Sequence, residues 1–179
     1  MHFIVDFTRF LVYNCIYKIN RKKEYQMKKR VFIFDLDGTV IDSEHRTPRD
    51  AQGKLILNEW FAMATPANIA KDTLLPLVSL FRKAKRKHHH IVICTARTLS
   101  EADREFLANH ALGAPFVLSR PQGDMTPDGE FKKRLLQDLF KVRFHGLKKI
   151  MFDDNDEVRE TVSKIGVKMV DPRPLNEAS

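Results

Sequence analysis

Val31-Phe32-Ile33-Phe34-Asp35-Leu36-Asp37-Gly38-Thr39 is the stretch that decides the fold, because a short apolar run leads directly into two carboxylates and a glycine. Consecutive Val, Ile and Phe residues closed by Asp-Gly are typical of a strand that is buried on both faces. In open parallel α/β sheets, ligands bind at the carboxyl edge of the strands. The sequence therefore predicts a doubly wound parallel sheet with Asp35 and Asp37 at its reactive edge.

Asp35 and Asp37 have the spacing for two separate tasks in phosphoryl transfer. Alternate side chains of an extended segment point the same way, so both carboxylates can approach one substrate. One carboxylate can attack phosphorus to form an aspartyl phosphate, while the other protonates the leaving oxygen and later deprotonates water. Gly38 would let the backbone turn sharply beside the phosphate. For the pair taken alone, an ordinary Asp-Gly turn after a strand is the alternative interpretation.

The segment Asp35-Leu36-Asp37-Gly38-Thr39-Val40 resembles the first motif of the haloacid dehalogenase (HAD) superfamily of phosphotransferases. The resemblance implies a second strand that ends in Ser or Thr, a lysine after the third strand, and a fourth strand that ends in paired acids. The chain has these elements in this order, at Thr95, Lys132 and Asp153-Asp154. The resemblance therefore implies a Rossmann-like, HAD-like phosphatase domain.

The same resemblance implies a role for each residue. Asp35 would be the nucleophile and Asp37 the acid and base, while Thr95 and Lys132 would hold the phosphoryl oxygens. Mg²⁺ is the implied cofactor, since it prefers oxygen ligands and is commonly held by one or two carboxylates together with waters and substrate oxygens. Its ligands would be Asp35, Asp37 through the backbone carbonyl, Asp153 and Asp154.

A narrower resemblance, to the 3′-phosphatase domain of phage polynucleotide kinase-phosphatases, runs from residue 31 to about residue 170. Arg46 lies nine residues after Asp37, where that family has a catalytic arginine, and Asp128 precedes Lys132 by four residues. Two further segments agree with it: Thr95-Ala96-Arg97 and Arg120-Pro121-Gln122-Gly123-Asp124. The resemblance implies that Arg46 and Arg97 receive the substrate's phosphate or flanking backbone. Asp128 would orient Lys132.

Two features depart from that family. Thr95-Ala96 replaces Ser-Gly, and Asn155 stands where the family has an arginine that bears on end recognition. The chain also lacks the Gly-x-x-x-x-Gly-Lys-Ser/Thr pattern of a phosphate-binding loop. We therefore expect a phosphatase without the kinase half.

Length and charge favour one catalytic domain, residues 27–179, preceded by a basic and aromatic extension, residues 1–26. The chain of 179 residues has a net charge of +8, and residues 1–30 hold eight basic and two acidic side chains. The catalytic part is therefore nearly neutral. The positive net charge of the chain does not indicate that the whole domain binds nucleic acid. The extension is too short and too polar for a spanning helix. We expect native translation to begin at Met27, with a surface amphipathic helix as the alternative.

The region between the first two strands is longer than one crossover helix requires. Apolar spacing predicts that helix over residues 74–87. A basic cluster at residues 82–90 overlaps its end and has two interpretations, a solvated helix end or a nucleic-acid contact. Residues 43–73 would form a small cap insert beside the active site. Trp60 in this insert either packs on the body or stacks on a base. The predicted strands span residues 31–35, 91–95, 115–118, 149–153 and 167–170.

The sequence thus predicts an Mg²⁺-dependent phosphomonoester hydrolase that acts on 3′-phosphate ends of polynucleotides. The alternatives are a 5′(3′)-deoxyribonucleotidase or broad small-molecule phosphatase and, from another class, a non-catalytic nucleic-acid-binding protein. The partner would be a phosphorylated nucleic-acid end or a nucleotide, with no obligate protein partner and no membrane span. Two distant cysteines, Cys15 and Cys94, favour free thiols and a reducing cytoplasm over a disulfide.

Overall fold

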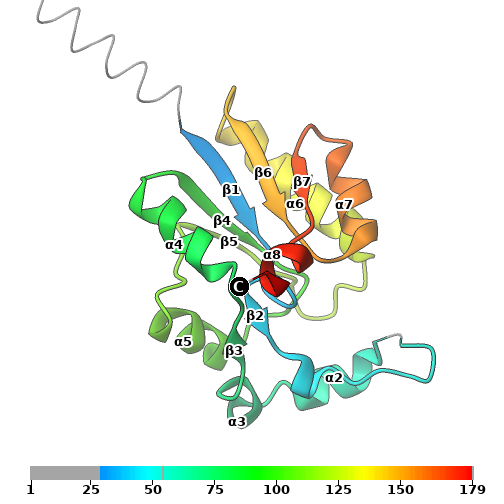
Figure 1. The fold of residues 1–179 in the computed structure, drawn as a ribbon. Helices are drawn as coiled ribbons and strands as arrows, with labels where there is room; N and C mark the ends of the chain where they lie inside the picture. The colour runs from blue at the N-terminus through cyan, green and yellow to red at the C-terminus, as the bar shows by residue number, and fades with distance from the viewer. Residues whose placement is uncertain (1–28, 54, 179) are drawn as a thin grey trace, which may run out of the picture.

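The computed structural model describes residues 29–53 and 55–178. Its main sheet has five parallel strands in the spatial order β5-β4-β1-β6-β7 (Figure 1). The strands are Arg30–Phe34 (β1), His90–Cys94 (β4), Phe116–Leu118 (β5), Lys148–Phe152 (β6) and Lys168–Val170 (β7). The predictions of a doubly wound parallel sheet and of a central first strand are confirmed.

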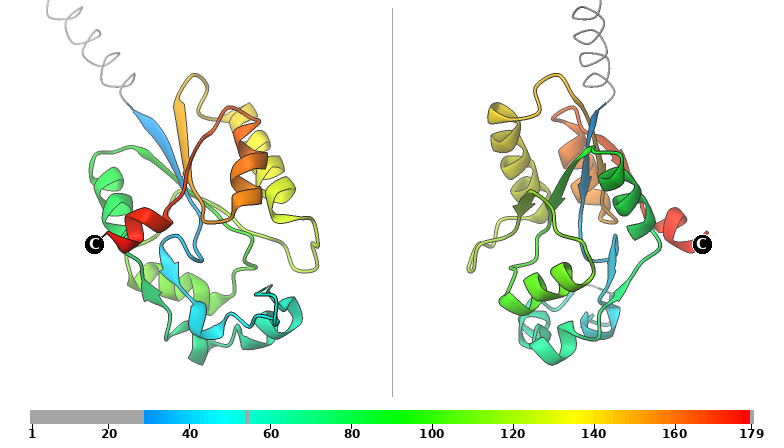
Figure 2. Two further views of the ribbon diagram at one scale, coloured as in Figure 1. Left: turned by 45° about the vertical axis from the view of Figure 1, so that its right-hand side comes forward. Right: turned by 90° about the vertical axis from the view of Figure 1, so that its left-hand side faces the viewer.

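Helices cover both faces of this sheet, as the two views of Figure 2 show. Phe32 and Phe34 of β1 pack in one core with α4 (Val78–Arg86) and α5 (Glu101–Asn109). Val31 and Ile33 pack in a second core with α6 (Asp128–Val142) and α7 (Asp156–Ser163). Because strand side chains alternate between faces, the continuous apolar run in β1 supplies both cores at once.

The insert after β1 is closed at its base by a small antiparallel pair. Strand β2 (Ile41–Asp42) leaves the body, and β3 (Thr73–Leu74) returns beside it. Between them lie the 3₁₀ helix η1 (Glu44–Arg46), α2 (Leu57–Met63) and α3 (Pro66–Ile69), beyond the carboxyl ends of the main strands (Figure 1). The C-terminal helix α8 (Arg173–Glu177) lies near this base, where Asn176 Nδ2 donates to the Thr39 carbonyl at 3.1 Å.

The predicted crossover helix over residues 74–87 begins too early. Helix α4 begins at Val78, because Leu74 pairs with Ile41 in the small sheet. Pro76 also disfavours helical backbone at the residue before it. The end of the helix, at Arg86, agrees with the prediction to within one residue.

Other predictions concern cysteines, membranes and the N-terminus. Cys94 is fully buried and free, as expected of a structural thiol. In the part of the chain that the structure describes, no helix is long and apolar enough to cross a membrane. The predictions for residues 1–26, including translation from Met27, fall outside the described residues.

Candidate active site

Three polar residues directly follow three neighbouring strands of the main sheet. Asp35 follows β1, Thr95 follows β4 and Asp153 follows β6. Each is almost fully buried, with exposed fractions of 7%, 1% and 0%. The parallel register brings these strand ends together, so residues far apart in sequence meet at one edge, as predicted from the sheet order.

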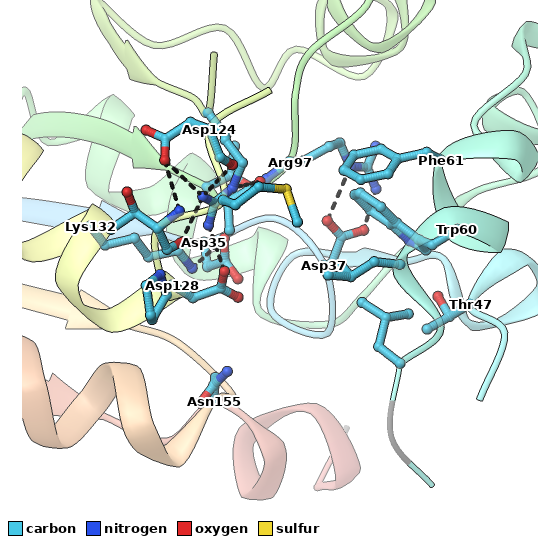
Figure 3. A pocket seen from close by; sticks show the side chains of 18 of the residues that line it. Asp35, Asp37, Thr47, Trp60, Phe61, Arg97, Asp124, Asp128, Lys132 and Asn155 are labelled. Atoms are coloured by element: carbon cyan, nitrogen blue, oxygen red, sulfur yellow. Dashed lines mark hydrogen bonds and ion pairs between the residues drawn. The ribbon is translucent and has the colours of Figure 1, made fainter. Parts of the chain in front are cut away.

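Lys132, from the first half of α6, lies between two of these carboxylates (Figure 3). Its Nζ is 3.0 Å from Asp35 Oδ1 and 2.8 Å from Asp153 Oδ2. Burial raises the pKa of Asp35 to about 7, although the ammonium of Lys132 opposes this shift. Burial also raises the pKa of Asp153, again against Lys132. One ammonium therefore compensates only part of the negative charge that collects at this edge.

A third carboxylate, Asp154, makes this edge suitable for a cation. Ligand oxygens of Asp35, Asp153 and Asp154 lie within 4.8 Å of one another. Burial, and then repulsion from Asp35, raise the pKa of Asp154 to about 6. Hard oxygen donors and excess negative charge together fit a hard divalent cation such as Mg²⁺.

Asp37 is held away from this acidic group by two donors. Arg97 Nε donates to Asp37 Oδ2 at 3.0 Å, and Arg97 Nη2 donates to Asp37 Oδ1. The Ser43 hydroxyl adds a hydrogen bond of 2.5 Å to Oδ1. Although burial opposes it, the guanidinium of Arg97 keeps the pKa of Asp37 below its ordinary value. The two carboxylates of the first motif thus differ in acidity in the free site, where Asp37 is the more readily ionised of the two.

Arg46 lies in η1 at the start of the insert, where it is fully buried and does not line the pocket, although the resemblance places it against the substrate. Its Nε and Nη2 each donate to Asp72 at 2.8 Å, and neither side chain of the pair is exposed. A buried guanidinium needs such a bidentate carboxylate, and Asp72 is available at the other end of the insert. In this structure Arg46 therefore supports the insert.

Asp128 does not hold Lys132 as expected, since the ammonium pairs with Asp35 and Asp153. Asp128 instead accepts a hydrogen bond of 2.6 Å from Arg120 Nη2. The same guanidinium donates to the carbonyls of Ala96, Asp124 and Thr126, at 2.8 to 3.0 Å. Arg120 therefore fixes the loop before α6 against the loop after β4.

A pocket of about 370 Å³ opens above these residues. In the view of Figure 3, Asp35 and Lys132 lie on one side, Trp60 and Phe61 of α2 project from the other, and Asp37 lies between them. Trp60 is 8% exposed and packs edge-on against Phe61, which is 43% exposed. Two further exposed apolar side chains, Leu57 and Met125, complete the wall. The pocket thus combines a charged floor with an apolar, aromatic side.

The structure brings most of the predicted site residues into this pocket. Its lining includes Asp35, Asp37, Thr95, Arg97, Asp128, Lys132 and Asp154. Asp153 lies just beneath them, at hydrogen-bond distance from Lys132. Sequence reasoning missed Ser43, Asp72 and Asp103, and it placed Phe61 in the insert beside the site without giving it a role. Only Asp103 had a recognisable signal, because Ser100-x-x-Asp103 is a capping-box pattern and caps α5 here.

Comparisons with known proteins identify the family of this chain. The sequence matches the family described as "Bacteriophage T5 5′-deoxynucleotidase" over residues 20–179. It is 30% identical, over 181 residues, to the 5′-deoxynucleotidase of Escherichia phage T5, covering 89% of this chain and 74% of that protein.

Two solved structures share the fold. One is a chain of the Pnkp1/Rnl/Hen1 RNA repair complex, with a TM-score of 0.60 and 20% identity, and the match covers 80% of this chain. This chain spans only 42% of that one. The other is a haloacid dehalogenase-like hydrolase from Streptococcus pneumoniae, with a TM-score of 0.58, 13% identity, and coverage of 80% and 84% of the two chains. The protein described here shares the fold of haloacid dehalogenase-like hydrolases, and it is a phosphatase that belongs to the phage T5 5′-deoxynucleotidase family.

Proposed function

We propose that this protein is an Mg²⁺-dependent 5′-nucleotidase, which releases the 5′-phosphate from deoxynucleoside monophosphates through an aspartyl phosphate on Asp35. One observation carries the proposal. The acidic edge of the sheet faces the aromatic wall of the insert across a single pocket, at the scale of one small ligand. The name of the phage T5 relative supports the same substrate class.

The chemistry follows from the positions of the side chains. Asp35 attacks phosphorus in line with the leaving oxygen, while Lys132 and the Thr95 hydroxyl hold the phosphoryl oxygens. Asp37 gives a proton to the leaving 5′-alkoxide and then takes one from the water that cleaves the aspartyl phosphate. Bound Mg²⁺, held by Asp35, Asp153 and Asp154, would neutralise phosphoryl charge in a loose transition state.

The aromatic side of the pocket suits the rest of a nucleotide. Phe61 is on the rim and exposes nearly half of its side-chain surface, so its ring is available to stack on a base. Trp60 lies deeper and packs against Phe61, which fixes the ring from behind. Stacking tolerates any base, so this wall favours a nucleotidase with little base preference.

The 3′-phosphate end of a polynucleotide remains the second candidate substrate, and the positions of Arg46 and Arg97 decide its rank. That interpretation depends on Arg46 as a phosphate-binding residue, and here Arg46 is buried against Asp72. Arg97 does line the pocket, yet both of its contacts to Asp37 would have to change for it to receive a phosphate. We therefore rank the monophosphate above the strand end.

A substrate panel tests the proposal. Phosphate release is measured for deoxynucleoside 5′-monophosphates, deoxynucleoside 3′-monophosphates and 3′-phosphorylated oligonucleotides, each with Mg²⁺ and with EDTA. We expect the 5′-monophosphates to have the highest kcat/KM and EDTA to abolish turnover. A higher kcat/KM for the oligonucleotide would reverse the ranking, and full activity in EDTA would remove the metal from the mechanism.

The covalent step has its own test. Asp35→Asn removes the nucleophile with little change in volume, so turnover should fall to background and no acid-stable, hydroxylamine-labile phosphoenzyme should form. A variant with the wild-type rate would refute Asp35 as the nucleophile.

A further inference from the structure

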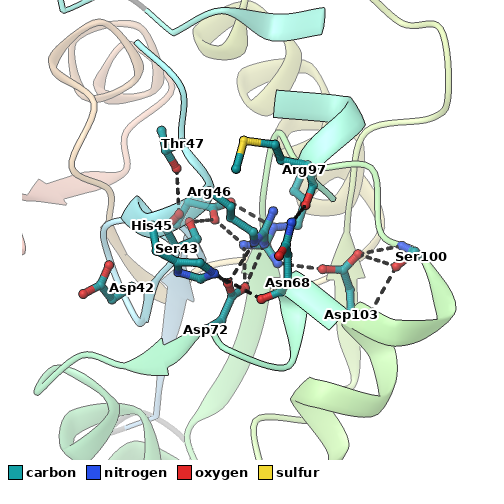
Figure 4. Close-up of polar contacts among 12 residues, drawn as sticks. Asp42, Ser43, His45, Arg46, Thr47, Asn68, Asp72, Arg97, Ser100 and Asp103 are labelled. Carbon is teal, nitrogen blue, oxygen red and sulfur yellow. Dashed lines mark hydrogen bonds and ion pairs between the residues drawn. The ribbon is translucent and has the colours of Figure 1, made fainter. Parts of the chain in front are cut away.

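A buried group of charged side chains, Arg46, Asp72, Arg97 and Asp103, lies at the base of the insert (Figure 4). Arg97 connects this group to Asp37. Arg46, at the start of the insert, and Asp72, at its end, form a bidentate pair with two contacts of 2.8 Å. Neither side chain is exposed to solvent. Because one residue lies at each end of the insert, this pair closes the insert's base.

Arg97 connects this pair to the reactive edge. Its Nη2 lies 3.5 Å from Asp72 Oδ2, and its Nη1 lies 2.6 Å from Asp103 Oδ1. The other oxygen of Asp103 accepts hydrogen bonds from the backbone and the hydroxyl of Ser100, at 2.8 and 2.7 Å. The remaining contacts of the guanidinium go to the two carboxylate oxygens of Asp37. Three carboxylates from three separate segments therefore fix one planar guanidinium.

The orientation of this guanidinium determines where the Asp37 carboxylate lies. A bidentate arginine–carboxylate pair is planar, so a rotation of one partner turns the other. Asp72 limits that rotation on the side of the insert, as Asp103 does on the side of α5. Asp72 does not line the pocket, so it has no direct route to a substrate bound there.

We propose that Asp72 is a positioning residue, which acts through Arg97 to place Asp37 for proton donation to the leaving group. The base of the insert is then part of the proton-transfer step as well as a support for the pocket wall. This inference rests on the acid role proposed above for Asp37.

Substrates with different leaving groups distinguish a positioning role of Asp72 from a merely structural one. p-Nitrophenolate leaves as a stable anion and needs no proton, whereas an alkoxide must be protonated as it leaves. A misplaced Asp37 therefore slows alkyl phosphates selectively. The ratio kcat/KM isolates this effect, because it covers the steps up to release of the alcohol and omits the later attack of water.

The experiment compares Asp72→Asn with the wild type on p-nitrophenyl phosphate and on the alkyl phosphate that the substrate panel finds best. We expect the loss in kcat/KM to be at least about tenfold larger for the alkyl ester, as removal of a positioned general acid implies. Asp42→Asn is the matched control, since Asp42 is an exposed carboxylate on the same base that accepts a hydrogen bond from the Glu44 backbone. Equal losses on both esters, or no loss on either, would overturn the proposal.

A second variant tests the same proposal if Asp72→Asn does not fold. Arg46→Met combined with Asp72→Asn removes both charges together, which avoids a buried arginine without its carboxylate. The same selective loss is expected. Asp37→Asn shows which inference fails: if it has no leaving-group selectivity, the acid role of Asp37 is wrong. If Asp37→Asn is selective and the Asp72 variants are not, only the positioning role is wrong.

Discussion

Gly38 and Asp154 are packed so closely that a side chain at position 38 would have to displace the Asp154 carboxylate. A Cβ atom on Gly38 would lie 2.5 Å from Asp154 Oδ2 and 2.8 Å from its Cγ. The backbone of Gly38 also has a φ of +64°, a region that side chains other than glycine rarely adopt. Gly38 of the first motif therefore leaves room for the carboxylate of Asp154, which belongs to the paired acids Asp153-Asp154. This contact brings two distant segments together at the proposed cation site.

Gly38→Ala should consequently damage the cation site more than the fold. The methyl group must displace the Asp154 carboxylate, so we expect roughly a hundredfold fall in kcat/KM and a weaker response to Mg²⁺. The left-handed backbone adds a cost of about 1–2 kcal/mol in unfolding free energy. Gly146→Ala is the control, because Gly146 has a φ of +69° and a Cβ added there would have nothing within 4 Å. Urea unfolding and a Mg²⁺ titration measure both effects. Wild-type Mg²⁺ dependence in Gly38→Ala would contradict this account.

Lys132→Met should reduce both stability and activity. The substitution leaves Asp35 and Asp153 without their shared ammonium, and breaking a buried ion pair costs about 3–5 kcal/mol. Loss of a preorganised charge at the phosphoryl site should lower kcat/KM by about 10²–10³. Lys133→Met is a control on the same helix, because Lys133 is partly exposed and pairs with Glu130. If the two variants behave alike, Lys132 has no special role.

Asp154→Asn should change the pH dependence of stability. In the metal-free protein, the pKa of Asp154 is raised from 3.8 to about 6. The unfolded chain therefore binds fewer protons between these values, and ionisation of Asp154 destabilises the fold as pH rises through this window.

Asparagine mimics the protonated carboxyl group, so in EDTA the variant should have a higher Tm than the wild type at a pH of about 7.5, with a smaller difference at about pH 5. Mg²⁺ should raise the Tm of the wild type at the higher pH more than that of the variant. A constant difference in Tm across this range would refute the shifted pKa.

The fold was predictable because one strand carries the information for both cores. The run Val31-Phe32-Ile33-Phe34 has apolar side chains at every position. A strand in a sheet with one solvent-exposed face would instead alternate apolar and polar residues. The meeting of Asp35, Thr95 and Asp153 then follows from parallel strand order.

The surroundings of the site were less predictable. Arg46 has the sequence position of a catalytic arginine, but its place depends on Asp72, which is 26 residues away and carries no pattern of its own. Similarly, the family resemblance implies that Asp128 is the acidic partner of Lys132, four residues later. The actual partners of Lys132 depend on how α6 packs over the ends of β1 and β6. Pairings of buried charges depend on tertiary geometry, which local spacing does not encode.

Phe61→Ala tests the proposed contact with the base. Phe61 is half exposed on the pocket rim, so truncation removes a stacking surface with little loss of core packing. Base–aromatic stacking contributes about 1–3 kcal/mol, which corresponds to a fall of about 5- to 150-fold in kcat/KM for deoxynucleoside 5′-monophosphates. Deoxyribose 5-phosphate has the same leaving group without a base, and its kcat/KM should stay near the wild-type value. Trp60 is a poorer probe, because it is buried and its loss would disturb the insert itself.

Val142→Ala is the control for Phe61→Ala, since Val142 is 70% exposed at the end of α6 and does not line the pocket. It should leave both substrates unaffected. The two substrates together identify what Phe61 does. An equal loss on both would mean that Phe61 shapes the insert as a whole, and no loss on either would mean that the base binds elsewhere. Only a loss confined to the nucleotide assigns this ring to base recognition, because the phosphate and sugar contacts are common to both esters.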